Sequence, residues 1–320
     1  MTEIRVLADD ELIREPGLYQ CSLDRHHSQP CNGVSVTSGI LRAMELQTPA
    51  DVWAFHQLNP DRYERKESPA LRMGRAMAAI VEGGLAEMER HYIVPDDDAP
   101  RRPTSQQIAA YDRGDATEKG TASVEYWRAM AADTREVLPE AEFDLIVAMG
   151  GVLAQSVEAA AVMAGLPEVT IAWFDEETQL WVLSRPDTVS LDGAISDYKK
   201  ISPQGGAFDY RLVDRRITQH GYDMQMSLGA EAMEMLGLGW PTSVGIVAQS
   251  DTPPYHVILR EIPEDVLRIA QFRNRRQRIR FRECLDSERW PGPGDDTGAY
   301  EYPQWLSEKL AAEMQTAHQG

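Results

Sequence analysis

A change in the apolar pattern near residue 165 constrains the fold of this 320-residue chain more than any other feature. Before it, segments 71–91 and 122–163 carry apolar residues at the intervals of a helix. After it, segments 169–174 and 180–183 are rich in β-branched and aromatic residues, which favours strands. This order predicts an α/β (α+β) protein, in which helices flank a small mixed sheet that follows a helical N-terminal section.

The rest of the pattern predicts where the other elements lie. The dipeptide Asp192-Gly193 is a favoured hairpin turn between two strands. The further elements that we expect are strands at 188–191, 194–197, 243–248 and 256–262, helices at 210–238 and 263–284, and a loop at 94–120. We expect a single domain (1–320), in which 1–165 is mainly helical, 166–285 is the α/β core and 286–320 is a C-terminal tail.

Composition limits the class of protein. Apolar residues make up 42% of the chain, which is enough to bury a hydrophobic core. The first residues lack the apolar stretch of a secretory signal, and the longest apolar run, 145–154, is half of the ~20 residues that span a bilayer. Three cysteines are too few for a disulfide framework or a four-thiolate iron–sulfur cluster. We therefore expect a soluble, cytoplasmic protein with no membrane partner.

The formal net charge of −19 argues against broad, nonspecific affinity for nucleic acid, because that affinity needs Lys and Arg to neutralise phosphates. It does not exclude an enzyme that acts on DNA. Such an enzyme would have to confine its positive potential to one groove and keep the rest of its surface acidic.

The only dense basic cluster that we identify lies in the predicted helix 263–284. Its members are Arg268, Arg273, Arg275, Arg276, Arg278, Arg280 and Arg282. One interpretation is a wall that follows DNA phosphates, with Arg273, Arg276 and Arg280 as contacts. The other is a solvated helix face that pairs with the many acids of the chain. Arg72 and Arg75 are further candidates for contacts with the DNA backbone.

The segment most informative about chemistry is Asp187, followed after nine residues by Asp197, Tyr198 and Lys199. Side chains alternate between the two faces of a strand, so Asp197 and Lys199 project to the same face. A hairpin through Asp192-Gly193 would fold the preceding strand back and bring Asp187 to that face too. Two carboxylates and one ammonium group would then converge.

Such a cluster has the chemistry of a Mg²⁺ or Mn²⁺ site that hydrolyses phosphodiesters. Hard divalent cations prefer oxygen ligands, and two aspartates with substrate phosphate oxygens supply them. The metal can lower the pKa of a bound water and neutralise charge in the transition state, while Lys199 stabilises developing negative charge. The alternative is plain, since an Asp–Lys pair on a strand is commonly a surface ion pair that contributes little.

With these residues, the chain resembles the RecE-type (exonuclease VIII-like) branch of the PD-(D/E)xK, or RecB-like, nuclease superfamily. The resemblance covers most of the chain, and its motifs are specific through their order and spacing together. The matching segments are Ser35–Ser38 with Leu41-Arg42, Thr48–Ala50, Pro69–Gly74, Glu168 ahead of 171–174, Arg185–Asp187, Asp197–Lys199, Tyr222–Gln225, Trp290–Gly292 and Tyr302–Trp305.

The resemblance implies a Mg²⁺-dependent exonuclease that digests one strand of linear double-stranded DNA, from 5′ to 3′, and leaves a 3′ overhang for a single-strand annealing recombinase. It also implies a ring-shaped homo-oligomer. Asp187, Asp197, Tyr198 and Glu168 are then the candidate metal ligands, and Gln225 joins the catalytic group. Tyr222 is a candidate DNA contact, although ordinary helix packing would also explain the Tyr222–Gln225 pair.

Two positions depart from the family pattern. Ala78 stands where the family has a histidine ligand, and Gly229 stands where it has a second tyrosine. A lost ligand should weaken one metal position, for which Glu168 is a possible substitute. The alternative function is therefore a degenerate, catalytically weak or inactive nuclease fold that binds DNA or a protein.

Overall fold

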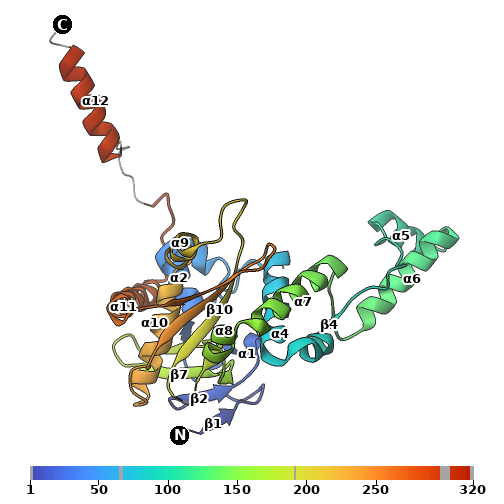
Figure 1. Ribbon diagram of the computed structural model, residues 1–320, viewed down its shortest axis with the longest axis horizontal. Coiled ribbons are helices and arrows are strands. Elements are labelled where there is room, and N and C mark those ends of the chain that lie inside the picture. Colours follow the sequence, from blue (N-terminus) through green and yellow to red (C-terminus); the bar gives the residue numbers. More distant parts are fainter. Residues whose placement is uncertain (1–2, 65–67, 191, 296–302, 318–320) are drawn as a thin grey trace.

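Two five-stranded sheets form the centre of the computed structural model, which describes residues 3–64, 68–190, 192–295 and 303–317 (Figure 1). The first sheet has the order β1-β2-β7-β8-β3, and the second has the order β12-β11-β10-β9-β6. The strands are β1 (Ile4–Val6), β2 (Gly17–Gln20), β3 (Ser35–Thr37), β4 (Tyr92–Ile93), β5 (Glu136–Val137), β6 (Leu166–Pro167), β7 (Thr170–Asp175), β8 (Leu180–Ser184), β9 (Thr188–Val189), β10 (Ile195–Ile201), β11 (Val244–Ser250) and β12 (Val257–Glu261).

Helices surround these sheets, and α10 lies at the centre of the largest hydrophobic core. Its buried face packs against β7, β8, β10 and β11, so one helix contacts both sheets, and α2 and α11 cover its other side. The helices are α1 (Leu23–His27), α2 (Ser38–Leu46), α3 (Pro49–Trp53), α4 (Pro69–His91), α5 (Ser105–Arg113), α6 (Glu118–Ala132), α7 (Glu140–Gln155), α8 (Val157–Val162), α9 (Tyr210–His220), α10 (Tyr222–Met235), α11 (Glu264–Ser287) and α12 (Gln304–Ala317).

A second core lies between α4 and α7, and it borders the sheet through Tyr198. The pair α5–α6 lies in the chain between the short parallel strands β4 and β5, and it projects away from the sheets (Figure 1). Within the described parts of the chain, no helix has the length and apolar character of a membrane span.

The α/β architecture and most of the predicted core elements are confirmed. Strands β7, β8, β10, β11 and β12 and helix α11 lie where the pattern places them. The expected hairpin forms between β9 and β10, although Leu191 of its first predicted strand lies outside the described residues, as does Tyr302 of the Tyr302–Trp305 motif.

Two expectations about elements were wrong, and a helix in the C-terminal tail was not anticipated. The predicted helix 210–238 is two helices, because Gly221 has a φ of +64° and ends α9 before α10 begins. The predicted loop 94–120 contains α5, whose N-terminus is capped by Thr104 and Gln107. The C-terminal tail contains α12. In addition, strands β1, β2 and β3 were not anticipated, and they complete the first sheet.

Candidate active site

The β9–β10 hairpin places Asp187 and Asp197 opposite each other. Its turn is closed by a hydrogen bond from Ser190 N to Ala194 O of 2.8 Å, and Gly193 supplies a φ of +88° that favours glycine. In the antiparallel register Ser196 pairs with Thr188, and the next step along the two strands brings Asp197 to Asp187. The amide of Tyr198 then donates to Asp187 Oδ2 over 2.7 Å.

Asp197 is the most enclosed of the site carboxylates. Its side chain is fully buried, and its Oδ2 forms an ion pair with Lys199 Nζ. Its Oδ1 accepts a hydrogen bond of 2.8 Å from Gln225 Nε2 on α10. The structure therefore brings together the four predicted catalytic residues, Asp187, Asp197, Lys199 and Gln225. Gln225 contacts Asp197 directly rather than Lys199.

The charges of this group act strongly on one another. Burial, and after it the negative charge of Asp197, raise the pKa of Asp187 well above its ordinary value. Burial alone would lower the pKa of Lys199, but the carboxylates of Asp197 and Asp187 outweigh it, and the pKa of Lys199 is raised. Lys199 is therefore an ammonium group at neutral pH, beside two acids that repel each other.

Glu168 is the third acid of the cluster, and an arginine holds it. The amide of Glu168 donates to Asp187 O over 3.1 Å, so its backbone adjoins the hairpin. Its carboxylate forms an ion pair with Arg185 Nε. Arg185 in turn donates from Nη1 to Cys21 O over 2.7 Å, which ties the Glu168 carboxylate to the end of β2.

Tyr198 contributes to the site only through its main chain. Its side chain lies on the other face of β10, among the residues between α4 and α7. There its hydroxyl donates to Gln249 Oε1 over 2.7 Å. Its carbonyl oxygen is thus the atom that could serve as a metal ligand, since the phenol is engaged elsewhere.

Tyr222 forms one side of the site, and its neighbour Arg42 was missed as a site residue. Lys199 Nζ lies 5.0 Å from the centre of the Tyr222 ring, and Arg42 Cζ lies 5.7 Å from it. Arg42 Nη1 also donates to His220 O, the C-terminal end of α9, over 3.2 Å. The sequence signal was the Leu41-Arg42 pair in the family pattern, which by itself assigns no role to Arg42.

The proposed basic wall on α11 is not supported, because most of its arginines are paired with acids of the chain itself. Arg273 pairs with Glu45 and Asp223, and Arg276 pairs with Glu45. The other pairs are Arg268 with Glu234 and Glu264, Arg275 with Glu177, Arg278 with Asp175 and Glu231, and Arg282 with Asp286. Among the described residues, Arg280 alone of this cluster has no carboxylate partner.

Arg72 and Arg75, the other candidate phosphate contacts, are also engaged. Arg72 makes a two-pronged ion pair with Glu142 at 2.9 and 2.7 Å, which joins α4 to α7. Arg75 pairs with Glu136 at 2.8 Å. Both side chains thus hold the α4–α7 region together, and the pairs reduce the positive charge they could offer to DNA.

Gly229, one of the two departures from the family pattern, is a packing position. A Cβ atom there would lie 2.9 Å from Ile195 Cδ1 and 3.4 Å from Ser184 Oγ. A Cβ there would force the terminal methyl of Ile195 to move, so the missing side chain lets α10 lie this close to β8 and β10. A tyrosine would need more room than α10 leaves there, so Gly229 is a close packing position in this fold.

The acid cluster offers too few side-chain ligands for a site built from protein groups alone, but enough for a magnesium ion that keeps several waters. Across the described ranges, no group of three or more His, Cys, Asp or Glu side chains is arranged to hold a metal. Mg²⁺, however, is commonly bound by one or two carboxylates and keeps several waters. Asp187 and Asp197, two close acids whose repulsion a cation would relieve, meet that smaller requirement.

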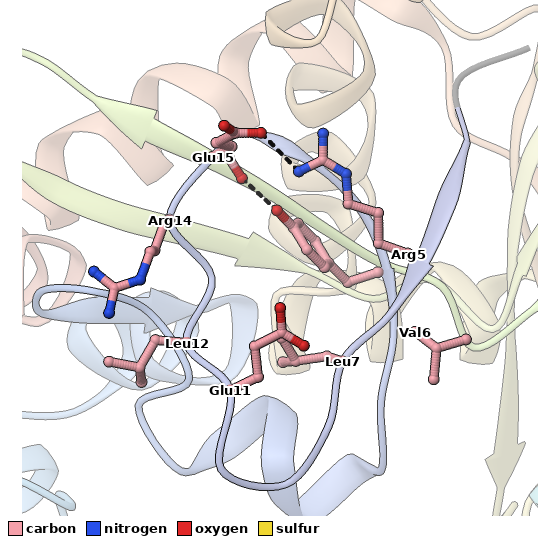
Figure 2. A pocket seen from close by; sticks show the side chains of 8 residues that line it. Arg5, Val6, Leu7, Glu11, Leu12, Arg14 and Glu15 are labelled. Atoms are coloured by element: carbon pink, nitrogen blue, oxygen red, sulfur yellow. Dashed lines mark hydrogen bonds and ion pairs between the residues drawn. The ribbon is translucent and has the colours of Figure 1, made fainter.

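A separate pocket of about 280 Å³ lies beside β1 and β2, away from the predicted site residues (Figure 2). Figure 2 shows Arg5 paired with Glu15. The Tyr19 hydroxyl donates to Glu15 O over 2.7 Å. The pocket is lined by Arg5, Val6, Leu7, Glu11, Leu12, Arg14, Glu15 and Tyr19. It therefore contributes nothing to the acid cluster.

Comparison with known proteins supports the fold. No protein-family model matches the chain, and no curated protein does. Among solved structures, the chain is similar to a protein from Eubacterium rectale described as a candidate exonuclease, with a TM-score of 0.58, 14% identity, and coverage of 91% of this chain and 98% of that one. The fold is thus an α/β core of the kind found in that protein.

A second solved structure, a phage-related exonuclease from Haemophilus somnus 129PT, matches with a TM-score of 0.29 and 14% identity. The match covers 59% of this chain and 92% of that one. This likeness is too low to add to the argument about the fold.

Proposed function

We propose that this chain is a metal-dependent exodeoxyribonuclease, which hydrolyses phosphodiester bonds of linear double-stranded DNA from its ends. The observation that carries the proposal is the convergence of Asp187, Asp197 and Lys199 on one hairpin, with Gln225 bound to Asp197. The fold similarity to a protein described as a candidate exonuclease supports the same reaction class. Double-stranded DNA ends are therefore the proposed partner.

Asp187 and Asp197 would hold Mg²⁺ or Mn²⁺, with the Tyr198 carbonyl and the Glu168 carboxylate as further oxygen donors. When bound, the ion supplies Lewis acidity to a phosphate oxygen and to a water. The donor set consists of hard oxygens only, which suits these ions and not a thiolate metal.

The residues of the chain divide the remaining work. Hydrolysis forms a bond from a water oxygen to phosphorus and breaks a phosphorus–oxygen ester bond, whose leaving oxygen takes a proton. Lys199, charged and fixed by Asp197, is suited to stabilise negative charge on the phosphoryl oxygens. Gln225 keeps the Asp197 carboxylate in place through Oδ1. Arg42 adds a second cation beside Tyr222.

The proposal extends to a place in recombination. It assigns digestion from 5′ to 3′ and a 3′ overhang that a single-strand annealing recombinase can use, with the nuclease acting as a ring of identical copies. These features follow from the family resemblance. They are tested by the labelled end that is lost first and by the mass of the assembly.

Linear and covalently closed duplex DNA of the same sequence test the proposed activity. Purified protein with Mg²⁺ or Mn²⁺ should release nucleotides from the linear form and leave the closed circle intact. Lys199→Ala should abolish this release, whereas Arg275→Gln, which removes an exposed ion pair with Glu177, should not. Nucleotide release that survives Lys199→Ala would refute the assignment.

A second candidate function, DNA or protein binding without cleavage, is favoured by Ala78 and by the absence of a three-ligand acid or histidine group among the described residues. Calorimetric titration with Mn²⁺ separates the two functions. Metal uptake by the wild type that is lost in Asp197→Asn supports the nuclease. No uptake, with or without DNA, supports the binding protein.

A further inference from the structure

Helix α9 carries three arginines that find no acid to pair with. Arg211 and Arg215 are exposed, and Arg216 is half-buried and donates only to the neutral Gln219. Within the described parts of the chain none of the three forms an ion pair. The one acid of the helix, Asp214, is neutralised by Arg260 of β12 at 2.7 and 2.9 Å.

Arginines without an ion pair occur elsewhere in the described parts of the chain too, singly or as one adjacent pair, but α9 holds three of them within six residues. The chain contains 51 acids against 32 lysines and arginines, so an arginine side chain readily finds a carboxylate. The arginines of α11 show it, since all but Arg280 are paired among the described residues. Positive charge that stays unpaired over six residues of α9 is thus a localised basic surface on an acidic protein.

The position of α9 links this surface to the acid cluster. The helix ends at His220, whose carbonyl binds Arg42 and whose ring stacks on Tyr222 with 5.4 Å between ring centres. Figure 1 shows α9 beside α2, the helix that carries Arg42. A rise of 1.5 Å per residue places Arg211 about 14 Å from His220 along the helix axis. That distance corresponds to about four nucleotides along duplex DNA.

We propose that the surface formed by the exposed Arg211 and Arg215 of α9, with the half-buried Arg216 beside them, binds the phosphate backbone of duplex DNA and leads it into the acid cluster. The inference rests on the proposed nuclease function and replaces α11 as its DNA-binding helix. Charge complementarity selects the partner, because unpaired guanidinium groups in line with a hydrolytic site match a polyanion.

The test compares two double variants of the full chain that lose the same charge. Arg211→Gln with Arg215→Gln removes two cations from α9. Arg275→Gln with Arg282→Gln removes two from α11, where Arg275 is exposed, Arg282 is half-buried, and the two are paired with Glu177 and Asp286. Binding of a fluorescent duplex is followed by anisotropy in EDTA, which prevents cleavage, over a series of KCl concentrations.

The α9 variant should bind more weakly, and its plot of log affinity against log salt should be shallower by about 1.8, because each phosphate contact contributes about 0.9. The α11 variant should keep the wild-type slope, and both should keep the wild-type melting temperature. Equal slopes in the wild type and the α9 variant, or equal losses in both variants, would overturn the surface.

Failure of the surface and failure of the nuclease give different results. If the wild type binds duplex DNA with the expected slopes but releases no nucleotides with Mg²⁺, the nuclease proposal fails and the α9 surface stands. If the wild type cuts linear DNA and the α9 variant keeps the wild-type slope, the α9 surface fails and the nuclease proposal stands.

Discussion

Asp187 occupies a position where the folded chain disfavours its charge. Burial and the neighbouring Asp197 raise its pKa, and Glu168 adds to this effect. Asp187 therefore keeps its proton to a higher pH in the folded chain than in the unfolded chain, and the free energy of unfolding falls as the pH rises through that window. Strain of this kind is expected where close acids serve to bind a cation.

Asp187→Asn should therefore raise the melting temperature of the metal-free protein near neutral pH. The amide removes the charge, and its oxygen can still accept the hydrogen bond from Tyr198 N. Thermal unfolding in EDTA measures the effect. Adding Mn²⁺ should stabilise the wild type and leave the variant unchanged. A variant that is less stable than the wild type in EDTA would contradict the electrostatic account.

His56 is a second buried group whose pKa is shifted, and here burial is the cause rather than a neighbouring charge. Only 4% of the residue is exposed, its Nδ1 accepts from Leu58 N over 3.2 Å, and burial lowers its pKa to about 4. Above the unfolded value near 6.5 both states are neutral, so His56 has no effect. As the pH falls from there, the unfolded chain takes up a proton that the folded chain refuses, and stability is lost down to about pH 4.

His56→Asn should therefore reduce the loss of stability between neutral pH and pH 4 by about 3 kcal/mol, from about 2.5 pKa units at 1.36 kcal/mol each. Asparagine can accept the same hydrogen bond but cannot take up the proton. Urea unfolding at the two pH values measures the change. Equal pH dependence in wild type and His56→Asn would contradict the assignment.

At the scale of elements, the close approach of α10 to the sheets determines where Gln225 lies. Gly229 lets α10 lie close to the two sheets, because Ile195 Cδ1 and Ser184 Oγ stand where a side chain of residue 229 would begin. Gln225 stands one turn earlier on the same helix and reaches Asp197 over 2.8 Å. The packing of a glycine thus sets the position of a candidate catalytic residue.

Gly229→Ala should lower the free energy of unfolding by up to about 2 kcal/mol, because overpacking typically costs about 1–3 kcal/mol and alanine gains about 1 kcal/mol over glycine inside a helix. Ile195→Val, which removes the nearest atom, should recover part of that loss. We expect a coupling energy of about 1 kcal/mol in the double-mutant cycle, measured by urea unfolding. Ile195→Val alone serves as the reference, because it costs about 0.5–1.5 kcal/mol in a normal core. Strictly additive effects would contradict the close contact.

The elements that the sequence predicts well are those with a strong local pattern. Strands β7 and β8 are buried and rich in β-branched and aromatic residues, so their positions could be predicted. The dipeptide Asp192-Gly193 favours a two-residue turn, so the β9–β10 hairpin that carries Asp187 and Asp197 could be predicted too. Strands β1, β2 and β3 have three or four residues each, too few for alternation to be recognised. The helix break at Gly221 depends on one left-handed residue, which a helical pattern does not reveal.

Pairing across the molecule is what the sequence could not supply. The seven arginines of α11 led to the prediction of a basic, DNA-binding helix. Several of their acidic partners, however, lie on α2, on α10 and in the β7–β8 turn, far away in the chain. The three arginines of α9 are fewer than the seven of α11, so the sequence alone does not single out α9 as a basic helix. Only the fold shows that none of these three arginines pairs with an acid among the described residues. Long-range ion pairs therefore decide which charges remain available.

At the scale of the whole molecule, the charge of −19 creates a problem for a nuclease that must stay on DNA through many steps. The protein's overall field repels a polyanion, and a single basic helix retains it only weakly as salt rises. An enclosing ring of copies solves this problem without affinity, because DNA held inside cannot diffuse away. The acidic balance of this chain thus fits the proposed homo-oligomer.

We therefore expect a mass in solution that is a multiple of 35.9 kDa, measured by light scattering, and processive digestion. With DNA in excess and a trap of unlabelled duplex added after the start, the products should be fully digested molecules beside untouched ones. A ring cannot exchange substrates before it reaches an end, so the trap should not shorten the digested tracts. A monomeric mass, with all DNA molecules shortening in parallel, would show instead that α9 and the acid cluster of one copy hold each end only briefly.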